Sequence, residues 1–133
     1  MKNAFSVLAL TAILALASCE KDEGKLPNIA FKTGSGYVSA NDSVKVDSVF
    51  TVGISASKAE SADVLKTFNL SRTINGVDSS LVTTSLSGSQ GDAFSNDYVL
   101  RAAAPAGTKA TYTFAVTNRD GLIGKVSLNI VSK

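Results

Sequence analysis

The sequence of 133 residues contains no histidine, no tryptophan and a single cysteine. Without imidazole, the chain has no general base for a Ser-His-Asp or Cys-His triad and lacks the commonest zinc ligand. One thiol also excludes an intramolecular disulfide and a two-cysteine redox motif. The usual nucleophilic, zinc and dithiol active sites are therefore excluded, and we do not expect an enzyme.

Carboxylates are the remaining groups that could support catalysis or bind a metal. Glycoside hydrolysis needs two of them on opposite sides of a bond, and calcium needs six or more oxygen ligands. The aspartates here stand mostly in turn-like settings, where they cap the backbone. Two partial oxygen clusters, explained equally well by hairpin turns, are Asn118 with Asp120 and Asp92 with Asn96 and Asp97. No metal, cofactor or catalytic pair is predicted.

Neither sign of charge is in clear excess, with 13 basic and 11 acidic residues, and the basic residues form no cluster. This balance argues against a nucleic acid as partner. Without its first 18 residues the chain would keep about 115, enough for one domain. A domain of this size buries about two-thirds of its unfolded surface, so it needs no disulfide.

The N-terminal segment has the pattern of a secretory signal. Lys2 precedes an apolar stretch, residues 5–17, that only Ser6 and Thr11 interrupt. This stretch is shorter than the roughly 20 residues that span a bilayer, and small residues follow it. We therefore expect residues 1–18 to be a signal peptide.

The segment Leu16-Ala17-Ser18-Cys19 resembles the bacterial lipobox. The resemblance implies that the thiol of Cys19 is diacylated and that Cys19 becomes the mature N-terminus, anchored to a membrane by its lipid. One acyl chain binds a bilayer only marginally, whereas several hold firmly. The alternative is an ordinary signal peptide cut after Ser18, which leaves a free cysteine.

The next residues, Lys21-Asp22-Glu23, resemble the acidic export signal of Bacteroidetes lipoproteins. The resemblance implies an outer-membrane lipoprotein exposed at the cell surface, with residues 19–27 as lipidated cysteine and acidic tether. A charged run of this kind also forms a solvated spacer without any signalling role. A protein facing the periplasm is then the alternative.

Residues 28–133 show the alternation of half-buried strands. Apolar residues occupy every second position in residues 50–56, 111–117 and 126–130. A further candidate strand has Phe94, Tyr98, Leu100 and Ala102 on one face. Residues 28–31 and 44–46 are expected to be edge strands. The dipeptide Asn75-Gly76 predicts a two-residue hairpin that pairs Ile74 with Val77, Arg72 with Ser79, Leu70 with Leu81, and Phe68 with Thr83. About seven short strands separated by turns predict a single antiparallel β-sandwich.

The segment from Tyr112 to Gly121 is similar to the closing hairpin of PKD and related bacterial Ig-like domains. The resemblance implies an Ig-like sandwich in which Tyr112 packs beneath the preceding corner. The chain is thus similar to small Bacteroidetes surface lipoproteins with one Ig-like domain.

Two features suggest contacts at the surface. Tyr37 lies beside Gly34-Ser35-Gly36, and an aromatic ring in a loop can stack on a sugar, although it can equally pack an edge strand. Ser43 and Ser48 each stand in an Asp-Ser-Val triplet that resembles the acceptor of Bacteroidetes O-glycosylation. Such triplets also occur by chance in chains rich in serine.

Together these patterns predict a non-catalytic cell-surface lipoprotein whose Ig-like domain is a binding or spacer module, as in a nutrient-capture or adhesion assembly. The expected partners are the membrane, through the lipid, and a glycan or an outer-membrane protein. The alternatives are a periplasm-facing structural lipoprotein and, more distantly, a carbohydrate-active enzyme.

Overall fold

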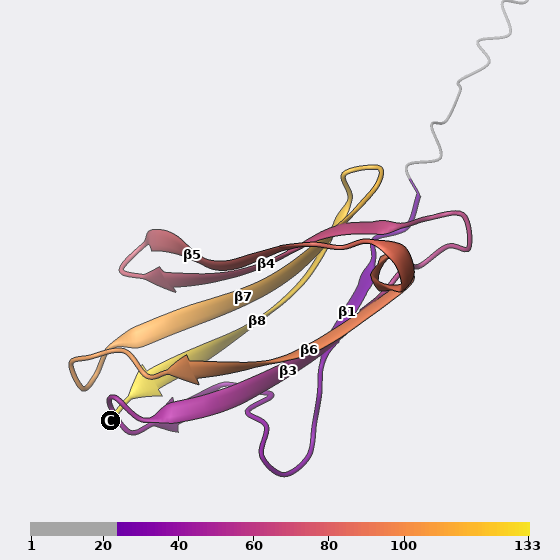
Figure 1. Cartoon of the computed structure of the whole chain (residues 1–133). Helices are drawn as coiled ribbons and strands as arrows, with labels where there is room; N and C mark the ends of the chain where they lie inside the picture. The colour runs from indigo at the N-terminus through magenta and orange to yellow at the C-terminus, as the bar shows by residue number, and fades with distance from the viewer. Residues whose placement is uncertain (1–23) are drawn as a thin grey trace, which may run out of the picture.

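The computed structural model describes residues 24–133, which form a sandwich of two β-sheets (Figure 1). One sheet has the strand order β1-β3-β6 and the other the order β2-β8-β7-β4-β5. The predicted all-β Ig-like sandwich is confirmed, with eight strands where about seven were expected. Their bounds are β1 (Asn28–Phe31), β2 (Asp42–Val44), β3 (Val49–Ser57), β4 (Leu65–Ile74), β5 (Val77–Ser85), β6 (Ala93–Arg101), β7 (Lys109–Asn118) and β8 (Ile123–Ser132).

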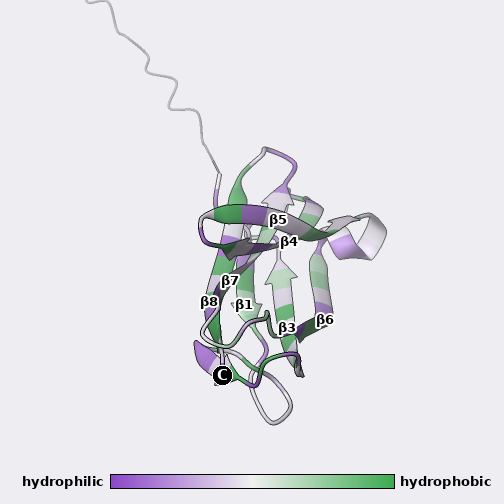
Figure 2. Ribbon diagram, turned by 90° about the vertical axis from the view of Figure 1, so that its left-hand side faces the viewer, coloured by the Kyte–Doolittle hydropathy of each residue, from purple (hydrophilic) through white to green (hydrophobic). Residues whose placement is uncertain are grey.

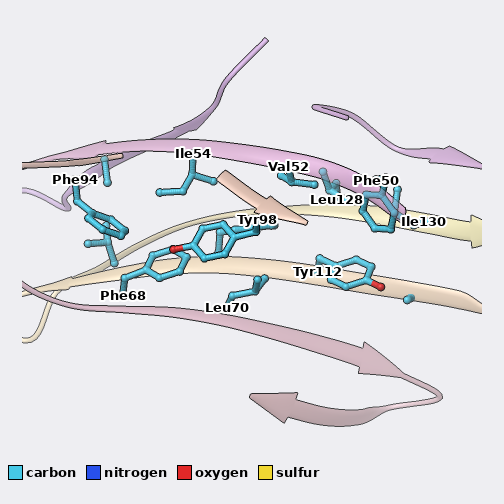
Figure 3. Close-up of a cluster of buried hydrophobic side chains, with 14 of the residues drawn as sticks. Phe50, Val52, Ile54, Phe68, Leu70, Phe94, Tyr98, Tyr112, Leu128 and Ile130 are labelled. Atoms are coloured by element: carbon cyan, nitrogen blue, oxygen red, sulfur yellow. The ribbon is translucent and has the colours of Figure 1, made fainter. Parts of the chain in front are cut away.

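The hydrophobic core lies between the two sheets, because each central strand turns every second side chain inward. In β7 the buried residues are Ala110, Tyr112, Phe114, Val116 and Asn118, with half-buried residues between them. Figure 2 shows apolar and polar residues interspersed along the strands of both sheets, and Figure 3 shows the inward side chains meeting between the sheets. The predicted phase of these strands is confirmed.

Aromatic rings from both sheets fill the centre of this core. Phe68 of β4 stacks on Tyr98 of β6, with ring centroids 5.2 Å apart. Phe114 meets Phe31 edge to face at 5.6 Å, and Phe50 meets Tyr112 at the same distance. Such pairs contribute beyond the area that they bury. The rings therefore fix how the two sheets sit on each other.

Tyr112 also ties β7 to the end of β6. Its hydroxyl donates a hydrogen bond to the carbonyl of Arg101, at 3.3 Å, just before the corner at Pro105. The ring is buried, and this burial raises the pKa of the phenol. Tyr112 thus packs against the strand end that leads into that corner, where the resemblance to Ig-like domains placed it.

The β4–β5 hairpin follows the predicted turn but not the whole predicted register. Asn75 and Gly76 have φ of 51° and 75°, as a two-residue turn requires, and Ile74 pairs with Val77. A bulge between Leu70 and Ser71 then shifts the ladder by one residue, so Leu70 faces Val82. The predicted pairs of Leu70 with Leu81, and of Phe68 with Thr83, are wrong.

The bulge coincides with a polar side chain inserted into the ladder. Asn69 Nδ2 donates to the carbonyl of Val82 at 3.1 Å, and also to the hydroxyls of Ser80 and Thr83 at 2.7 and 2.9 Å. The extra residue on β5 is Leu81, which is 39 % exposed. Because a bulge adds one residue to one strand only, counting outward from the turn fails beyond it.

The edge strand predicted at residues 44–46 is displaced. It covers Asp42–Val44 and pairs parallel with β8, with Ser43 opposite Val131. The chain reaches it by crossing from β1 in one sheet to the edge of the other sheet beside β8. A crossing of this kind allows parallel pairing, whereas a tight hairpin imposes antiparallel pairing. The sandwich is therefore antiparallel except at this edge.

Candidate functional site: a tyrosine, a lysine and an aspartate over a glycine

The predicted lipid and export sites, at Cys19, Lys21, Asp22 and Glu23, lie outside the described residues, as does the predicted signal peptide. They stay predictions. The described candidates are Tyr37, Ser43 and Ser48.

Tyr37 ends a short excursion of the chain beside β3. Lys32 N donates to Gly53 O and Val38 N to Thr51 O, both at 2.8 Å, so the chain pairs with β3 before and after residues 33–37. Two glycines with positive φ, Gly34 and Gly36, turn the chain within this excursion. The loop is thus anchored at both ends, and it returns the ring of Tyr37 onto the sheet.

Gly53 provides the space that this ring occupies. It lies in the middle of β3, opposite Asp97 of β6, on the outer face of the three-stranded sheet. A Cβ at Gly53 would lie 2.7 Å from Lys32 Cδ and 2.8 Å from both Asp97 Oδ1 and Tyr37 Cε1. Any side chain there would displace all three. We call Lys32, Tyr37, Gly53 and Asp97 the Tyr37 cluster.

Hydrogen bonds fix the cluster internally. Lys32 Nζ lies 2.7 Å from Asp97 Oδ1, and the Tyr37 hydroxyl donates to Asp97 Oδ2 at 3.0 Å. The ammonium is also 6.0 Å from the centroid of the Tyr37 ring. Both oxygens of one carboxylate are therefore engaged, each by a different strand or loop.

The ion pair keeps both groups charged over a wide pH range. The hydrogen bond from Lys32 lowers the pKa of Asp97, helped by the bond from Tyr37, while the same bond to Asp97 raises the pKa of Lys32. The side chains of Lys32 and Asp97 are 27 % and 46 % exposed. A ligand can therefore reach a carboxylate, an ammonium and an aromatic ring gathered on one patch of sheet.

The sequence-based prediction found Tyr37 but missed Lys32, Gly53 and Asp97. One signal was present, since Gly53 interrupts an otherwise regular strand pattern, and a glycine inside a strand often marks close approach of another group. Lys32 and Asp97 are 65 residues apart, and nothing local in the sequence joins them.

The two candidate acceptors of O-glycosylation differ in their surroundings. Ser43 is exposed in the edge strand β2, where the Asp42 side chain accepts a hydrogen bond from its backbone N–H at 2.7 Å. Ser48 is half-buried, and its hydroxyl donates to the carbonyl of Lys45 within a turn. Ser43 is thus the more accessible of the two hydroxyls.

The five-stranded sheet presents a second polar surface, on its outer face. Hydroxyls there bond across the strands, as Thr113 does with Ser127 at 3.0 Å and Thr111 with Asn129 at 2.6 Å. Outward positions on β4 and β7 include Thr67, Asn69, Ser71, Thr73, Thr111, Thr113, Ala115 and Thr117, with the exposed Lys109 at the start of β7. These positions carry no aromatic ring, unlike the Tyr37 cluster.

The partial oxygen clusters serve other purposes in the fold. Asn118 Oδ1 accepts hydrogen bonds from the backbone of Asp120 and Leu122, at 3.0 and 2.9 Å, which closes the β7–β8 turn. Asp92 pairs with Lys58 at 2.7 Å. Among residues 24–133, no three acids, histidines or cysteines lie close enough together to hold a metal ion. The same part of the chain has no helix that could span a membrane.

No protein family profile and no curated protein matches the sequence. The sandwich is similar to solved structures of superoxide reductase (neelaredoxin) from Ignicoccus hospitalis, including two single-residue variants. One of these structures has a TM-score of 0.56 at 12 % identity, and the match covers 81 % of this chain and 80 % of that one. Another has a TM-score of 0.57 at 13 % identity, over 82 % of this chain and 81 % of that one. A third structure has a TM-score of 0.57 at 13 % identity, and the match covers 85 % of this chain and 84 % of that one. At this identity, the likeness shows the fold alone.

These neighbours correct the functional prediction drawn from the sequence. That prediction took an Ig-like sandwich to be a non-catalytic binding or spacer module, but the solved structures that share this sandwich are enzymes. The fold therefore gives no ground for the prediction, and we withdraw it. Function has to be argued from side chains, because one fold carries many activities.

The side chains of this chain can be compared with those that redox metals need. Enzymes that transfer single electrons to or from oxygen species commonly use haem, flavin, copper or non-haem iron. Imidazole and thiolate are the usual protein ligands of such metals, and this sequence has no histidine and one cysteine. The donor set available in residues 24–133 does not fit a redox metal, and we derive no step through one.

Proposed function

We propose that the Tyr37 cluster is a binding site for a neutral glycan. The observation that carries the proposal is the convergence of Lys32, Tyr37 and Asp97 over Gly53, where a carboxylate, an ammonium and a ring share one exposed patch. This site-specific proposal replaces the withdrawn prediction.

The chemistry of the cluster suits a sugar. A sugar hydroxyl both donates and accepts, so it can bridge an ammonium and a carboxylate that lie side by side, while an aromatic face accommodates the apolar side of the ring. Because Lys32 and Asp97 neutralise each other, the patch does not favour a strongly charged ligand. Its internal hydrogen bonds order the side chains before binding, which reduces the entropy lost on association.

The proposed location depends on the N-terminal motifs. The lipobox-like segment supports a lipid on Cys19, and Lys21-Asp22-Glu23 supports export to the outer surface of the outer membrane. A glycan or an outer-membrane protein is accessible there. We also propose that Ser43 carries an O-linked sugar, since its triplet matches the acceptor pattern and the residue is exposed.

Affinity electrophoresis tests the proposed ligand class. The mature chain with Cys19→Ser, which stays soluble, is run through gels that contain starch, xylan, mannan or dextran. We expect at least one polymer to retard it, and Tyr37→Ala and Gly53→Ala to weaken retardation about tenfold, the effect of losing about 1.4 kcal/mol. Val99→Ala serves as the matched control, because Val99 is exposed on the same sheet face two residues from Asp97.

Two results would contradict the proposal. One is migration unaffected by all four polymers. The other is retardation that Tyr37→Ala and Gly53→Ala leave unchanged, since binding would then occur elsewhere. Thermal unfolding of each variant, measured alongside, separates loss of binding from loss of fold.

A further inference from the structure

The chain enters the fold at one end of the sandwich. At Gly24, a Cβ would lie 3.4 Å from both Glu60 Oε2 and Leu122 Cδ1. Three residues later Pro27 is buried, and its carbonyl oxygen would lie 2.1 Å from a Cβ at Gly124, so only glycine fits there. Figure 1 shows the indigo start of the described chain beside the β7–β8 turn.

Exposed apolar side chains lie at this same end. Leu26 is 59 % and Ile123 is 50 % exposed, although their chain neighbours Pro27 and Gly124 are in contact. Exposed lysines flank both of them in the sequence. We call Lys25, Leu26, Leu122, Ile123 and Lys125 the anchor-end patch.

The tether is short enough to keep this patch close to the membrane. If Cys19 carries the lipid, five residue steps separate it from Gly24, and an extended chain covers at most about 3.6 Å per residue, or roughly 18 Å. That reach is close to the radius of a domain of this size. The end of the sandwich that receives the tether is therefore the end nearest the lipid.

We propose that the anchor-end patch rests on the lipid surface, with Leu26 and Ile123 inserted among the headgroups. This inference rests on the proposed acylation of Cys19. Exposed leucine and isoleucine side chains lose water in the interface, and lysines extend their stems along it while their ammonium groups stay hydrated. This end also carries two carboxylates, since Glu60 Oε2 and Asp120 Oδ2 would lie 3.4 and 4.0 Å from a Cβ at Gly24. With acidic groups present besides the lysines, apolar contact rather than charge attraction holds the patch down.

Contact at this end orients the whole domain. The β4–β5 turn lies at the opposite end of the sandwich from the start of the described chain (Figure 1). Val77, just after that turn, is 65 % exposed. The strands would stand away from the membrane, with Val77 out of reach of the lipid.

The absence of tryptophan allows a direct test. The lipidated full chain is prepared with a single indole, as Leu26→Trp, Ile123→Trp or, as the control, Val77→Trp. Each variant is reconstituted in phosphatidylcholine–phosphatidylglycerol vesicles whose acyl chains carry bromine near the headgroup. We expect loss of fluorescence and a blue shift for Leu26→Trp and Ile123→Trp, and neither change for Val77→Trp.

Flotation of the same vesicles reports anchoring separately. Protein that floats but shows no quenching at either patch position would overturn the inference while leaving the anchor intact. Equal quenching at all three positions would overturn the proposed orientation. Protein that does not float at all would contradict the proposed lipid anchor and, with it, this inference. That result would not bear on glycan binding.

Discussion

Truncation of Phe114 is the sharpest test of how the two sheets are held together. Phe114 is fully buried in β7, and its ring lies 5.6 Å from Phe31, 6.1 Å from Tyr98 and 6.5 Å from Phe68. Two of those partners, Phe31 and Tyr98, come from the opposite sheet. Phe114→Ala therefore leaves a cavity at the contact between the sheets, where neighbours from both layers would have to move to fill it.

The expected cost is about 3–5 kcal/mol in the free energy of unfolding. A small domain has about 5–15 kcal/mol in total, so the variant should unfold at much lower urea while remaining folded in buffer. Urea titration followed by circular dichroism measures this, and the slope of the transition should stay the same. Val99→Ala, at a position 68 % exposed, is the control and should change stability by at most about 0.5 kcal/mol. An effect of Phe114→Ala as small as that of the control would refute the account of the core.

Three further predictions concern the anchor, the tether and the cluster. Cys19→Ser should abolish incorporation of labelled palmitate, because only the thiol accepts the diacylglyceryl group; persistent labelling would refute the lipoprotein proposal. Alanine at residues 21–23 should leave palmitate labelling and thermal stability unchanged. The same change should protect the domain from protease added to intact cells. Equal degradation of wild type and variant would show that the acidic run is only a spacer. The hydrogen bonds from Lys32 and Tyr37 lower the pKa of Asp97. The stabilising effect of these bonds is therefore present above the ordinary value of 3.8 and is lost as pH falls through the lower folded value. The amide resonance of Gly53 should therefore shift with a midpoint below pH 3.8, and a transition centred above that value would contradict the ion pair.

The sequence predicted features that depend on near neighbours. Alternation in β3 and β7 identified the buried faces, because the side-chain period of a strand is two wherever one face is covered. Asn75-Gly76 identified the turn, because both positions need positive φ. These signals are contained within a few residues, so they survive without knowledge of the rest of the fold.

The features that the sequence did not predict depend on contacts between distant segments. The bulge in the β4–β5 hairpin accompanies the bonds of Asn69 to the opposite strand, which no count from the turn reveals. Parallel pairing of β2 with β8 joins Ser43 to Val131. The Tyr37 cluster likewise needs three strands to be side by side before Lys32 and Asp97 meet over Gly53. Only a tertiary arrangement brings such groups together.

The most direct test of the proposed glycan site is chemical-shift mapping of the soluble mature chain. Amide resonances are recorded during titration with oligosaccharides prepared from whichever polymer retards the chain in gels. The account predicts that the largest shifts fall on Lys32, Tyr37, Gly53 and Asp97, and that Gly53→Ala moves the titration to about tenfold higher oligosaccharide, as a loss of about 1.4 kcal/mol requires. Shifts confined to the hydroxyl-rich face of the five-stranded sheet, or none at saturating oligosaccharide, would contradict it.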